Sequence, residues 1–248
     1  MQGGSVRFYI GFDDTDFPGS DVGTGKLARR FPETLPPGCT LWGVVRQQLL
    51  VDRAIPYTSH NSAACVVVHG PDLSILRELL ALAVEHIERE ALRDSDPGLC
   101  VVAGNDPALT DLGVFGQACT SRIVTQDEAR KAAGPAHLSG HGGTCDGIIG
   151  AAAAVGLTAS GWAGRFIEYA DLRSLPERPT VAALEQKGIR VVSLDRDAFC
   201  PRRDDVVFTK GWLRPRLWGN EAVLPVKPLG PGLWESMGEK RNKKTSQD

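Results

Sequence analysis

The stretch Val6-Arg-Phe-Tyr-Ile-Gly-Phe-Asp-Asp-Thr-Asp16 decides how the rest of the chain is interpreted. Residues 6–12 are mostly apolar or aromatic, which predicts a buried strand. Asp13, Asp14 and Asp16 follow at once, so the strand would deliver three carboxylates at its C-terminal end. Carboxylates gathered in this way repel one another unless a cation holds them, and Mg²⁺ favours hard oxygen ligands. The motif indicates either a magnesium site or an acidic turn with capping aspartates.

Two well-known phosphate-handling motifs resemble this region but do not match it. Asp14-Thr15-Asp16 resembles the D-x-D pair of haloacid-dehalogenase-type phosphatases, which need Thr or Val two residues later, where this chain has Pro18. The segment 23–26, Gly-Thr-Gly-Lys, resembles the end of a P-loop, but Ser20 stands where that motif needs Gly and Leu27 where it needs Ser or Thr. A P-loop is therefore excluded, although these glycines could still present backbone N–H groups to an anion.

Two further polar segments are candidates for binding. Residues 57–62, Tyr-Thr-Ser-His-Asn-Ser, are six hydrogen-bonding residues in a row, which is more than a turn needs. They indicate a binding segment or a surface loop, with His60 as a base or a solvated histidine. Residues 140–147, Gly-His-Gly-Gly-Thr-Cys-Asp-Gly, lead into an Ala-rich helix whose N-terminus would favour a phosphate. The alternative is that Gly147 and Gly150 only permit close helix packing.

The remaining pattern mixes helices and strands and predicts an α/β protein. Apolar residues between 76 and 87 repeat at helical spacing, so 72–93 is the clearest helix, and strands at 63–68 and 99–103 complete a ferredoxin-like βαβ unit. Thr125 and Glu128 give a capping box that opens a short helix. Further helices are expected at 26–30, 145–155 and 180–187, and strands at 41–51, 161–169, 189–194, 206–210, 213–218 and 222–226, the last three antiparallel.

The composition is that of an ordinary globular protein. The 248 residues are 42% apolar and 23% charged, which excludes disorder, collagen-like repeats and coiled coil. With 28 Lys and Arg against 30 Asp and Glu, the net charge of −2 argues against gripping nucleic acid by bulk charge alone. Six cysteines form no C-x-x-C pair, which indicates reduced thiols and neither disulfides nor a zinc site. The start of the chain and its short apolar runs predict a cytoplasmic protein with no membrane partner.

Three segments together resemble the archaeal tRNA-Ile agmatinylcytidine (agmatidine) synthetase family. Its G-[IF]-D-D-T-D motif and the loop after it are matched by residues 11–16 and 22–25. Its P-x-K-T-R-G-N-[GA]-A segment corresponds to residues 56–63, Pro-Tyr-Thr-Ser-His-Asn-Ser-Ala. Its R-G-[LIV]-I-G-A-L-A-A-[IV]-G segment corresponds to residues 146–156. The turn Asp96-Pro97-Gly98 resembles a D-P-G turn of the family. The order and approximate spacing agree over about residues 6–230.

The resemblance implies an α/β fold with a kinase-like lobe and a ferredoxin-like lobe, discontinuous in sequence. We expect the kinase-like ATP and magnesium lobe at residues 1–62 and 105–175, the ferredoxin-like lobe at 63–104 and 176–235, and a flexible tail at 236–248. The family's OB-fold and zinc ribbon are expected to be lacking. Three cationic positions of the family motifs hold other residues in this chain. In the second motif, Thr58 or its neighbour stands in place of Lys and His60 in place of Arg, and in the third motif Asp146 stands in place of Arg. The cations that could substitute for them are Lys26, Arg29, Arg46 and Arg53.

The resemblance also implies an ATP- and Mg²⁺-dependent enzyme that activates a tRNA cytidine by phosphorylation before agmatine displaces the phosphate. We therefore expect an ATP-dependent phosphotransferase or ligase-type enzyme with a small-molecule or RNA acceptor. The alternatives are a non-catalytic nucleotide- or RNA-binding module and a divergent metal-dependent phosphatase.

Each expected role falls on particular residues. Thr24 is expected as phosphoryl acceptor or phosphate contact, with Asp14 and His60 as the other catalytic residues. The expected magnesium ligands are Asp13, Asp14 and Asp16. The residues expected to bind ATP are Gly23, Gly25, Lys26, Ser59, Asn61, Gly142, Gly143, Thr144 and Gly147.

Overall fold

The computed structural model describes residues 5–17, 20, 22–56, 60–194 and 199–238. Contacts between residues divide the chain into two compact units, Met1–Tyr169 and Ala170–Asp248, each of which is described by itself. Within the described part of the chain, no helix is long and apolar enough to cross a membrane.

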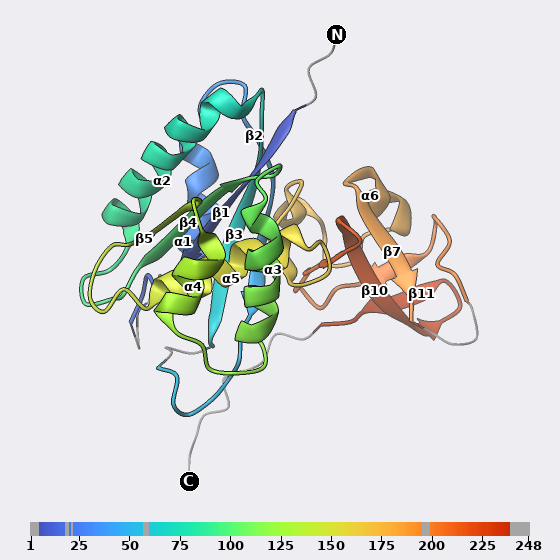
Figure 1. The fold of residues 1–248 in the computed structure, drawn as a ribbon. Helices are drawn as coiled ribbons and strands as arrows, with labels where there is room; N and C mark the ends of the chain where they lie inside the picture. Colours follow the sequence, from blue (N-terminus) through green and yellow to red (C-terminus); the bar gives the residue numbers. More distant parts are fainter. Residues whose placement is uncertain (1–4, 18–19, 21, 57–59, 195–198, 239–248) are drawn as a thin grey trace. The chain divides into compact units, whose positions relative to one another are not determined.

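The first unit is built on an antiparallel sheet with the opening segment of the chain in its interior (Figure 1). Along the sheet the order is β5-β4-β1-β3-β2-β6. Each neighbouring pair runs antiparallel. The strands are β1 (Val6–Asp13), β2 (Thr40–Gln48), β3 (Ser62–Gly70), β4 (Gly98–Ala103), β5 (His137–Gly140) and β6 (Arg165–Glu168).

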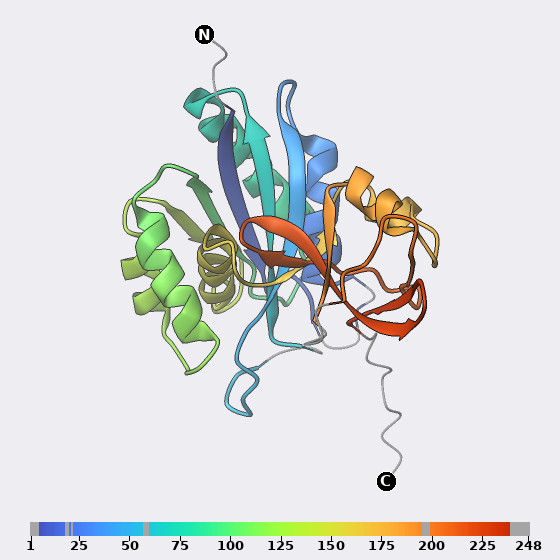
Figure 2. The same cartoon turned by 90° about the vertical axis from the view of Figure 1, so that its right-hand side faces the viewer.

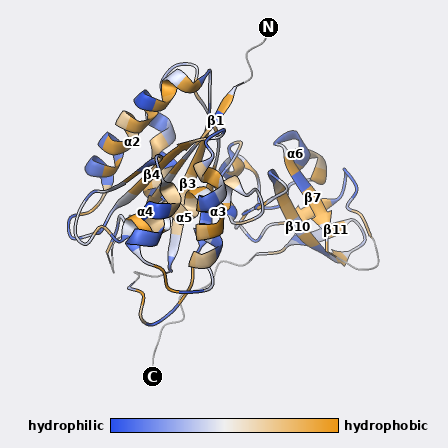
Figure 3. Cartoon of the chain, in the orientation of Figure 1, coloured by the Kyte–Doolittle hydropathy of each residue, from blue (hydrophilic) through white to orange (hydrophobic). Residues whose placement is uncertain are grey.

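Successive side chains of β1 enter two hydrophobic cores, one on each face of the sheet. Phe8, Ile10 and Phe12 are fully buried against helices α1 and α2, whereas Tyr9 belongs to the core beneath α3, α4 and α5. Figures 1 and 2 show helices on both faces, and Figure 3 shows α2 with hydrophilic and hydrophobic bands, the pattern of a helix with one buried side. The helices are α1 (Thr24–Arg30), α2 (Leu76–Glu90), α3 (Ala108–Cys119), α4 (Gln126–Ala133) and α5 (Gly147–Ala159).

The predicted βαβ unit is present as β3, α2 and β4, with β1 inserted between its two strands. Both strands run antiparallel to β1 and therefore parallel to each other, which is a split βαβ arrangement. Because β1 hydrogen-bonds to both, residues 63–104 lie in the same sheet as the start of the chain. The discontinuous division expected from the sequence, which set 63–104 apart together with 176–235, thus differs from the division at Tyr169 that the contacts give.

Helix α5 packs against the sheet almost backbone to backbone. A methyl group on Gly11 of β1 would overlap the carbonyl oxygen of Ala151, and one on Gly98 of β4 would overlap the backbone of Gly147. On the other side of α5, a methyl group on Gly156 would overlap the carbonyl oxygen of Leu112 in α3. The small residues of α5 therefore bring its first turn against the ends of β1 and β4.

The second unit is a small mixed sheet around one long strand. β10 pairs in parallel with β7 and antiparallel with both β9 and β11, and β8 extends the sheet in parallel beside β11. The helix α6 (Val181–Gln186) begins at Thr180, whose hydroxyl accepts a hydrogen bond from the N–H of Ala183. The strands are β7 (Ile189–Ser193), β8 (Val206–Phe208), β9 (Arg216–Trp218), β10 (Glu221–Gly230) and β11 (Leu233–Ser236).

The structure confirms the α/β class and most expected elements, including the capping box formed by Thr125 and Glu128. Three elements were not predicted, namely α3, β5 and β11. The expectation of antiparallel pairing holds for β9 and β10 but is wrong for β8, which pairs in parallel. Two residues of the expected tail have fixed contacts: Ser236 is buried in β11, and the Met237 N–H donates to the Pro225 carbonyl. Residues 239–248 lie outside the described part of the chain.

Candidate functional site

The end of β1 places a desolvated carboxyl group against the first turns of α5. A methyl group on Gly150 would overlap the Asp13 carboxyl, so only glycine leaves room for it. Burial raises the pKa of Asp13 to about 8, and the charge of Asp14 raises it further, while a hydrogen bond from the Asp14 backbone acts in the opposite direction. A carboxyl group in this state resists ionisation near neutral pH unless positive charge is brought to it.

Asp14 lies in the same acidic cluster. Its backbone has a φ of 51°, the left-handed region that Asp tolerates better than most residues. Burial raises its pKa to about 7, and the charges of Asp96, Asp16 and Asp146 raise it in that order. Five carboxyl groups thus influence one another at this end of the sheet, and two of them, Asp96 and Asp146, come from distant parts of the chain.

The loop after β1 is tied to the start of α1 by two threonines. The Thr24 hydroxyl accepts hydrogen bonds from the hydroxyl and the backbone N–H of Thr15, at 3.1 and 3.4 Å. Both threonines are buried. A hydroxyl that accepts two hydrogen bonds still has its own proton to donate. Next to it, Gly23 caps α1, and a methyl group there would sit 3.2 Å from an Asp16 carboxylate oxygen.

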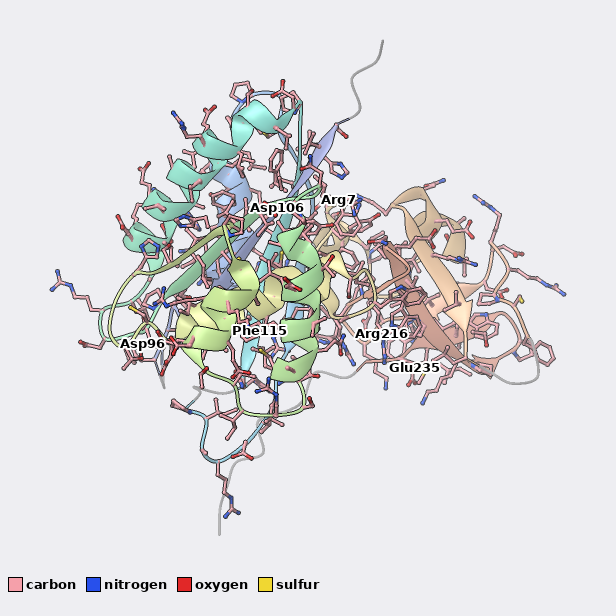
Figure 4. All side chains as sticks on the ribbon, in the orientation of Figure 1. Arg7, Asp96, Asp106, Phe115, Arg216 and Glu235 are labelled. Carbon is pink, nitrogen blue, oxygen red and sulfur yellow. The ribbon has the colours of Figure 1, made fainter. Side chains whose placement is uncertain are left out.

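Several N–H groups of the glycine-rich turn before α5 donate hydrogen bonds within the protein. The Thr144 N–H donates to the Asp96 carboxylate, and the Gly147 N–H donates to the Asp96 carbonyl at 3.0 Å. Figure 4 labels Asp96 at this end of the unit. Gly142 and Gly143 have positive φ values of 156° and 51°, and a methyl group on Gly143 would overlap the Asp96 carboxylate. Asp96 therefore stands where the sequence predicts a bound phosphate.

Asp146 is held on the outer side of the same turn. The Gln126 side-chain amide donates to the Asp146 carboxylate at 2.7 Å and to the Thr144 carbonyl at 2.8 Å. Gln126 is the first residue of α4, so this helix fixes the start of α5 through one side chain. Asp146 replaces the arginine of the family motif and adds negative charge to the cluster.

Positive charge lies at the same end of the sheet, two and three strands away from β1. Phe12, Ala64, Arg46 and Arg165 form one cross-strand row over β1, β3, β2 and β6. Arg46 and Arg165 are therefore direct neighbours of like charge, which destabilises a strand pair. Burial lowers the pKa of Arg46, and the charge of Arg165 lowers it further. Among the described residues, neither arginine is paired with a carboxylate.

The polar segment 57–62 lies partly outside the described residues, Ser59 included. Asn61 is described: its side-chain amide donates to the Leu50 carbonyl at 2.6 Å, and its own carbonyl accepts from Leu49 N–H at 2.9 Å. Asn61 thus closes the β2–β3 connection, and these hydrogen bonds stay within that connection. Its expected role in binding ATP stays a prediction. His60, which begins the described part of the segment, is exposed. A role of His60 in catalysis stays a prediction.

The remaining predicted site residues are Gly25 and Lys26, expected to bind ATP, and the expected magnesium ligands together with Thr24. Gly25 lies in α1, where an added methyl group would sit 3.2 Å from Ile167 of β6, and Lys26 is half-buried beside it. Their expected role in binding ATP stays a prediction. Within the described residues, no three His, Cys, Asp or Glu side chains are grouped closely enough to hold a metal ion by themselves. Asp13, Asp14 and Asp16 as magnesium ligands, and Thr24 as phosphoryl acceptor, stay predictions.

Sequence reasoning missed two residues of this site. Asp96 was noted only as part of a turn, although the D-P-G sequence places a carboxylate immediately before a strand that pairs with β1. Arg165 gave no signal, because only the pairing of β2 with β6 sets it opposite Arg46.

Known structures with this fold were found among tRNA-modifying enzymes. The chain is similar to TiaS in its complex with an isoleucine tRNA and ATP, with 27% identity and a TM-score of 0.51 over 61% of this chain and 36% of that one. It is similar to TiaS in its complex with the same tRNA, AMPCPP and agmatine, with 27% identity and a TM-score of 0.50 over the same shares. Apo TiaS, described as a tRNA agmatidine synthetase, gives 27% identity and a TM-score of 0.49 over 60% and 35% of the two chains.

The similarity covers little more than a third of the TiaS chain. No protein-family model matches the sequence, and no curated protein matches it. The fold is thus similar to that of TiaS, as the resemblance of the motifs predicts.

Proposed function

We propose that the first unit is an ATP-dependent catalytic unit that transfers a phosphoryl group from Mg²⁺-ATP to an acceptor. The observation that carries the proposal is the position of the Asp13–Asp16 segment at the end of β1, in a fold similar to that of an enzyme solved with ATP. The Thr24 hydroxyl and the two cross-strand arginines lie at the same end of the sheet.

The acidic cluster fits the requirements of magnesium. The ion takes one or two carboxylates and completes its coordination with water and substrate phosphates, so three grouped side chains are not needed. Asp13 and Asp14, whose pKa values are raised to about 8 and 7, are acids in need of positive charge. They would hold the ion, with Asp16 beside them. Bound with ATP, magnesium would neutralise the charge on the transferring phosphate.

The arginine pair is a further candidate for phosphate contact, beside the expected contacts of the glycine-rich turn. Arg46 and Arg165 repel each other in the empty protein, and an anion between them would remove that repulsion. Phosphoryl transfer depends on positive charge placed in advance, which two half-buried arginines provide. Thr24 would then be either the acceptor of the phosphoryl group or the residue that positions the Thr15 loop.

RNA is the acceptor that the second unit favours. Residues 170–248 hold 15 Lys and Arg against 11 Asp and Glu, a balance of +4, whereas residues 1–169 hold 13 against 19, a balance of −6. Three arginines of this unit lie over aromatic rings, with Arg214 4.0 Å from the centre of the Trp212 ring. A basic balance with arginine and aromatic side chains interleaved is typical of RNA-binding surfaces. The basic balance of the second unit is not visible in the net charge of −2 for the whole chain, because the first unit is acidic.

Turnover of Mg²⁺-ATP with and without bulk tRNA tests the reaction. We expect tRNA-stimulated release of ADP, the product of phosphoryl transfer, measured by chromatography, and a loss of turnover of about 100-fold or more in Asp14→Asn and Arg46→Gln. Arg77→Gln, which changes an exposed arginine of α2, is the matched control and should keep full turnover. Mass spectrometry of the protein after incubation would locate any phosphate on Thr24.

Two results would replace this proposal. Tight ATP binding without any turnover or phosphorylation would select the non-catalytic binding module. Hydrolysis of a phosphomonoester with no need for ATP would select the metal-dependent phosphatase.

A further inference from the structure

A second cluster of reactive side chains lies at the edge of the sheet and takes no part in the site described above. The Ser139 hydroxyl of β5 lies 2.7 Å from Nε2 of His141, and Nδ1 of His141 lies 3.2 Å from a Glu88 carboxylate oxygen of α2. Nε2 of His137 contacts the same hydroxyl at 2.8 Å. We call these four residues the Ser139 relay. The three residues 137, 139 and 141 alternate along β5 and one residue past its end, so they lie on one face of the strand, where His141 meets Glu88 of α2.

The chemistry of the four groups fixes the positions of the protons. A carboxylate only accepts, so Nδ1 of His141 donates to Glu88, and Nε2, when it carries no proton, is an acceptor. The single hydroxyl proton of Ser139 then points to His141, and Nε2–H of His137 donates to the serine oxygen. Burial lowers the pKa of His137, which favours its neutral form.

This is the arrangement of an activated nucleophile: a hydroxyl, a base that can take its proton, and a carboxylate that orients the base. The base is shielded, with its side chain 8% exposed, while the orienting carboxylate is 60% exposed. Ser139 itself is only half-buried. A reagent from solution can therefore reach the hydroxyl.

The edge of the sheet also supplies a donor for a developing oxyanion. The His141 N–H donates to the Pro97 carbonyl next to β4 at 2.8 Å, so by the alternation of an antiparallel pair the Gly140 N–H points away from β4. Beyond β5 the sheet of the first unit has no further strand among the described residues. Within the described residues, the N–H of the residue after Ser139 therefore has no strand partner on that side, which leaves it available to a developing oxyanion.

We propose that Ser139 is a nucleophile for acyl transfer, with carboxylic esters as the substrate class, His141 as its base and Glu88 as the positioning residue of that base. In the first step Oγ of Ser139 forms a bond to the acyl carbon and its proton passes to Nε2 of His141. That proton then goes to the leaving alcohol as the ester C–O bond breaks. Water hydrolyses the acyl-serine, with His141 taking a proton from the water and returning it to Oγ.

A fluorophosphonate probe on the full chain tests the nucleophile directly, because phosphonylation breaks the P–F bond and leaves a stable mark on serine. We expect one phosphonyl group on Ser139, located by peptide mass spectrometry, and release of p-nitrophenol from p-nitrophenyl acetate. Ser139→Ala should abolish both. His141→Gln should slow labelling by about 100-fold or more, and Glu88→Gln by about tenfold or more.

Ser121→Ala is the matched control, since Ser121 is exposed and bonds only to backbone carbonyls. It should label like the unaltered protein. Ser139→Cys gives a second readout independent of esters: its thiol should react with iodoacetamide at pH 6 faster than the exposed Cys200 of the same molecule. Labelling of Ser139 no faster than in urea-unfolded protein, or unchanged in His141→Gln, would overturn the proposal.

Discussion

The Asp13 carboxyl is a source of instability that a single isosteric change should remove. Its pKa lies at about 8 in the folded protein against 3.8 in the unfolded chain. The folded state favours the protonated form of this carboxyl group. The group therefore costs no stability below pH 3.8, where both states hold the proton, and the free energy of unfolding falls as the pH rises from 3.8 to 8. Each pH unit between 3.8 and 7 costs about 1.4 kcal/mol, or about 4 kcal/mol at pH 7. Asp13→Asn should therefore raise the free energy of unfolding by about 2–4 kcal/mol at pH 7, since the buried amide retains part of the desolvation cost.

Urea unfolding followed by circular dichroism from pH 4 to 9, with EDTA present, measures this effect. The gain in Asp13→Asn should be near zero at pH 4 and grow up to pH 8. Asp204→Asn, at an exposed position, should show no such trend. With millimolar Mg²⁺, the difference in free energy of unfolding between Asp13→Asn and the unaltered protein should narrow at pH 8, because the ion would place positive charge beside the Asp13 carboxylate. A gain that is equal at pH 4 and pH 8, or a less stable Asn variant at pH 8, would refute the reasoning.

Three further changes test the packing around the site. Gly11→Ala should lower stability by about 1–3 kcal/mol in urea unfolding, because its methyl group meets the α5 backbone, while Gly230→Ala, with open space around it, should be nearly neutral. Thr125→Ala removes the capping box of α4 and should cost about 1 kcal/mol, seen as a lower thermal midpoint; an unchanged midpoint would contradict the capping role. Gln47→Leu removes 3.0 Å hydrogen bonds to the Thr158 hydroxyl and a nearby carbonyl, and should cost about 1–3 kcal/mol in the same assay; a stabilised variant would show that these two oxygens find other partners.

The parts of the fold that follow from local pattern could be predicted. The continuous apolar run of β1 buries side chains on both faces of the strand, the helical spacing of α2 buries one face of the helix, and both elements lie where expected. α3 was missed because Gly113 and Gly116 weaken its helical signal. A methyl group on Gly116 would lie only 2.8 Å from the Leu157 side chain of α5, so this glycine allows the two helices to pack closely, which only the tertiary structure shows. β5 was missed because four residues, His-Leu-Ser-Gly, are too short and polar to reveal a period of two.

The candidate site could be predicted only where a motif is continuous in sequence. The Asp13–Asp16 segment identified the end of β1, but its electrostatics depend on Asp96 and Asp146, which the strand order and α5 bring there. The glycines of residues 140–147 were expected to offer N–H groups to a phosphate. In the structure the Thr144 N–H donates to the chain's own Asp96, and no sequence pattern distinguishes an internal carboxylate from an external anion.

The glycine contacts of α5 have a mechanical consequence. Where a helix meets a sheet through long side chains, rotamer changes absorb small displacements of either partner. Gly11, Gly98 and Gly156 leave no such layer between α5, the sheet and α3. A displacement at the end of β1, such as a bound ligand would cause, should therefore move α5 and α3 together with the strand. Amide exchange in α3, on the far side of α5 from the acidic cluster, should then report on what binds at Asp13.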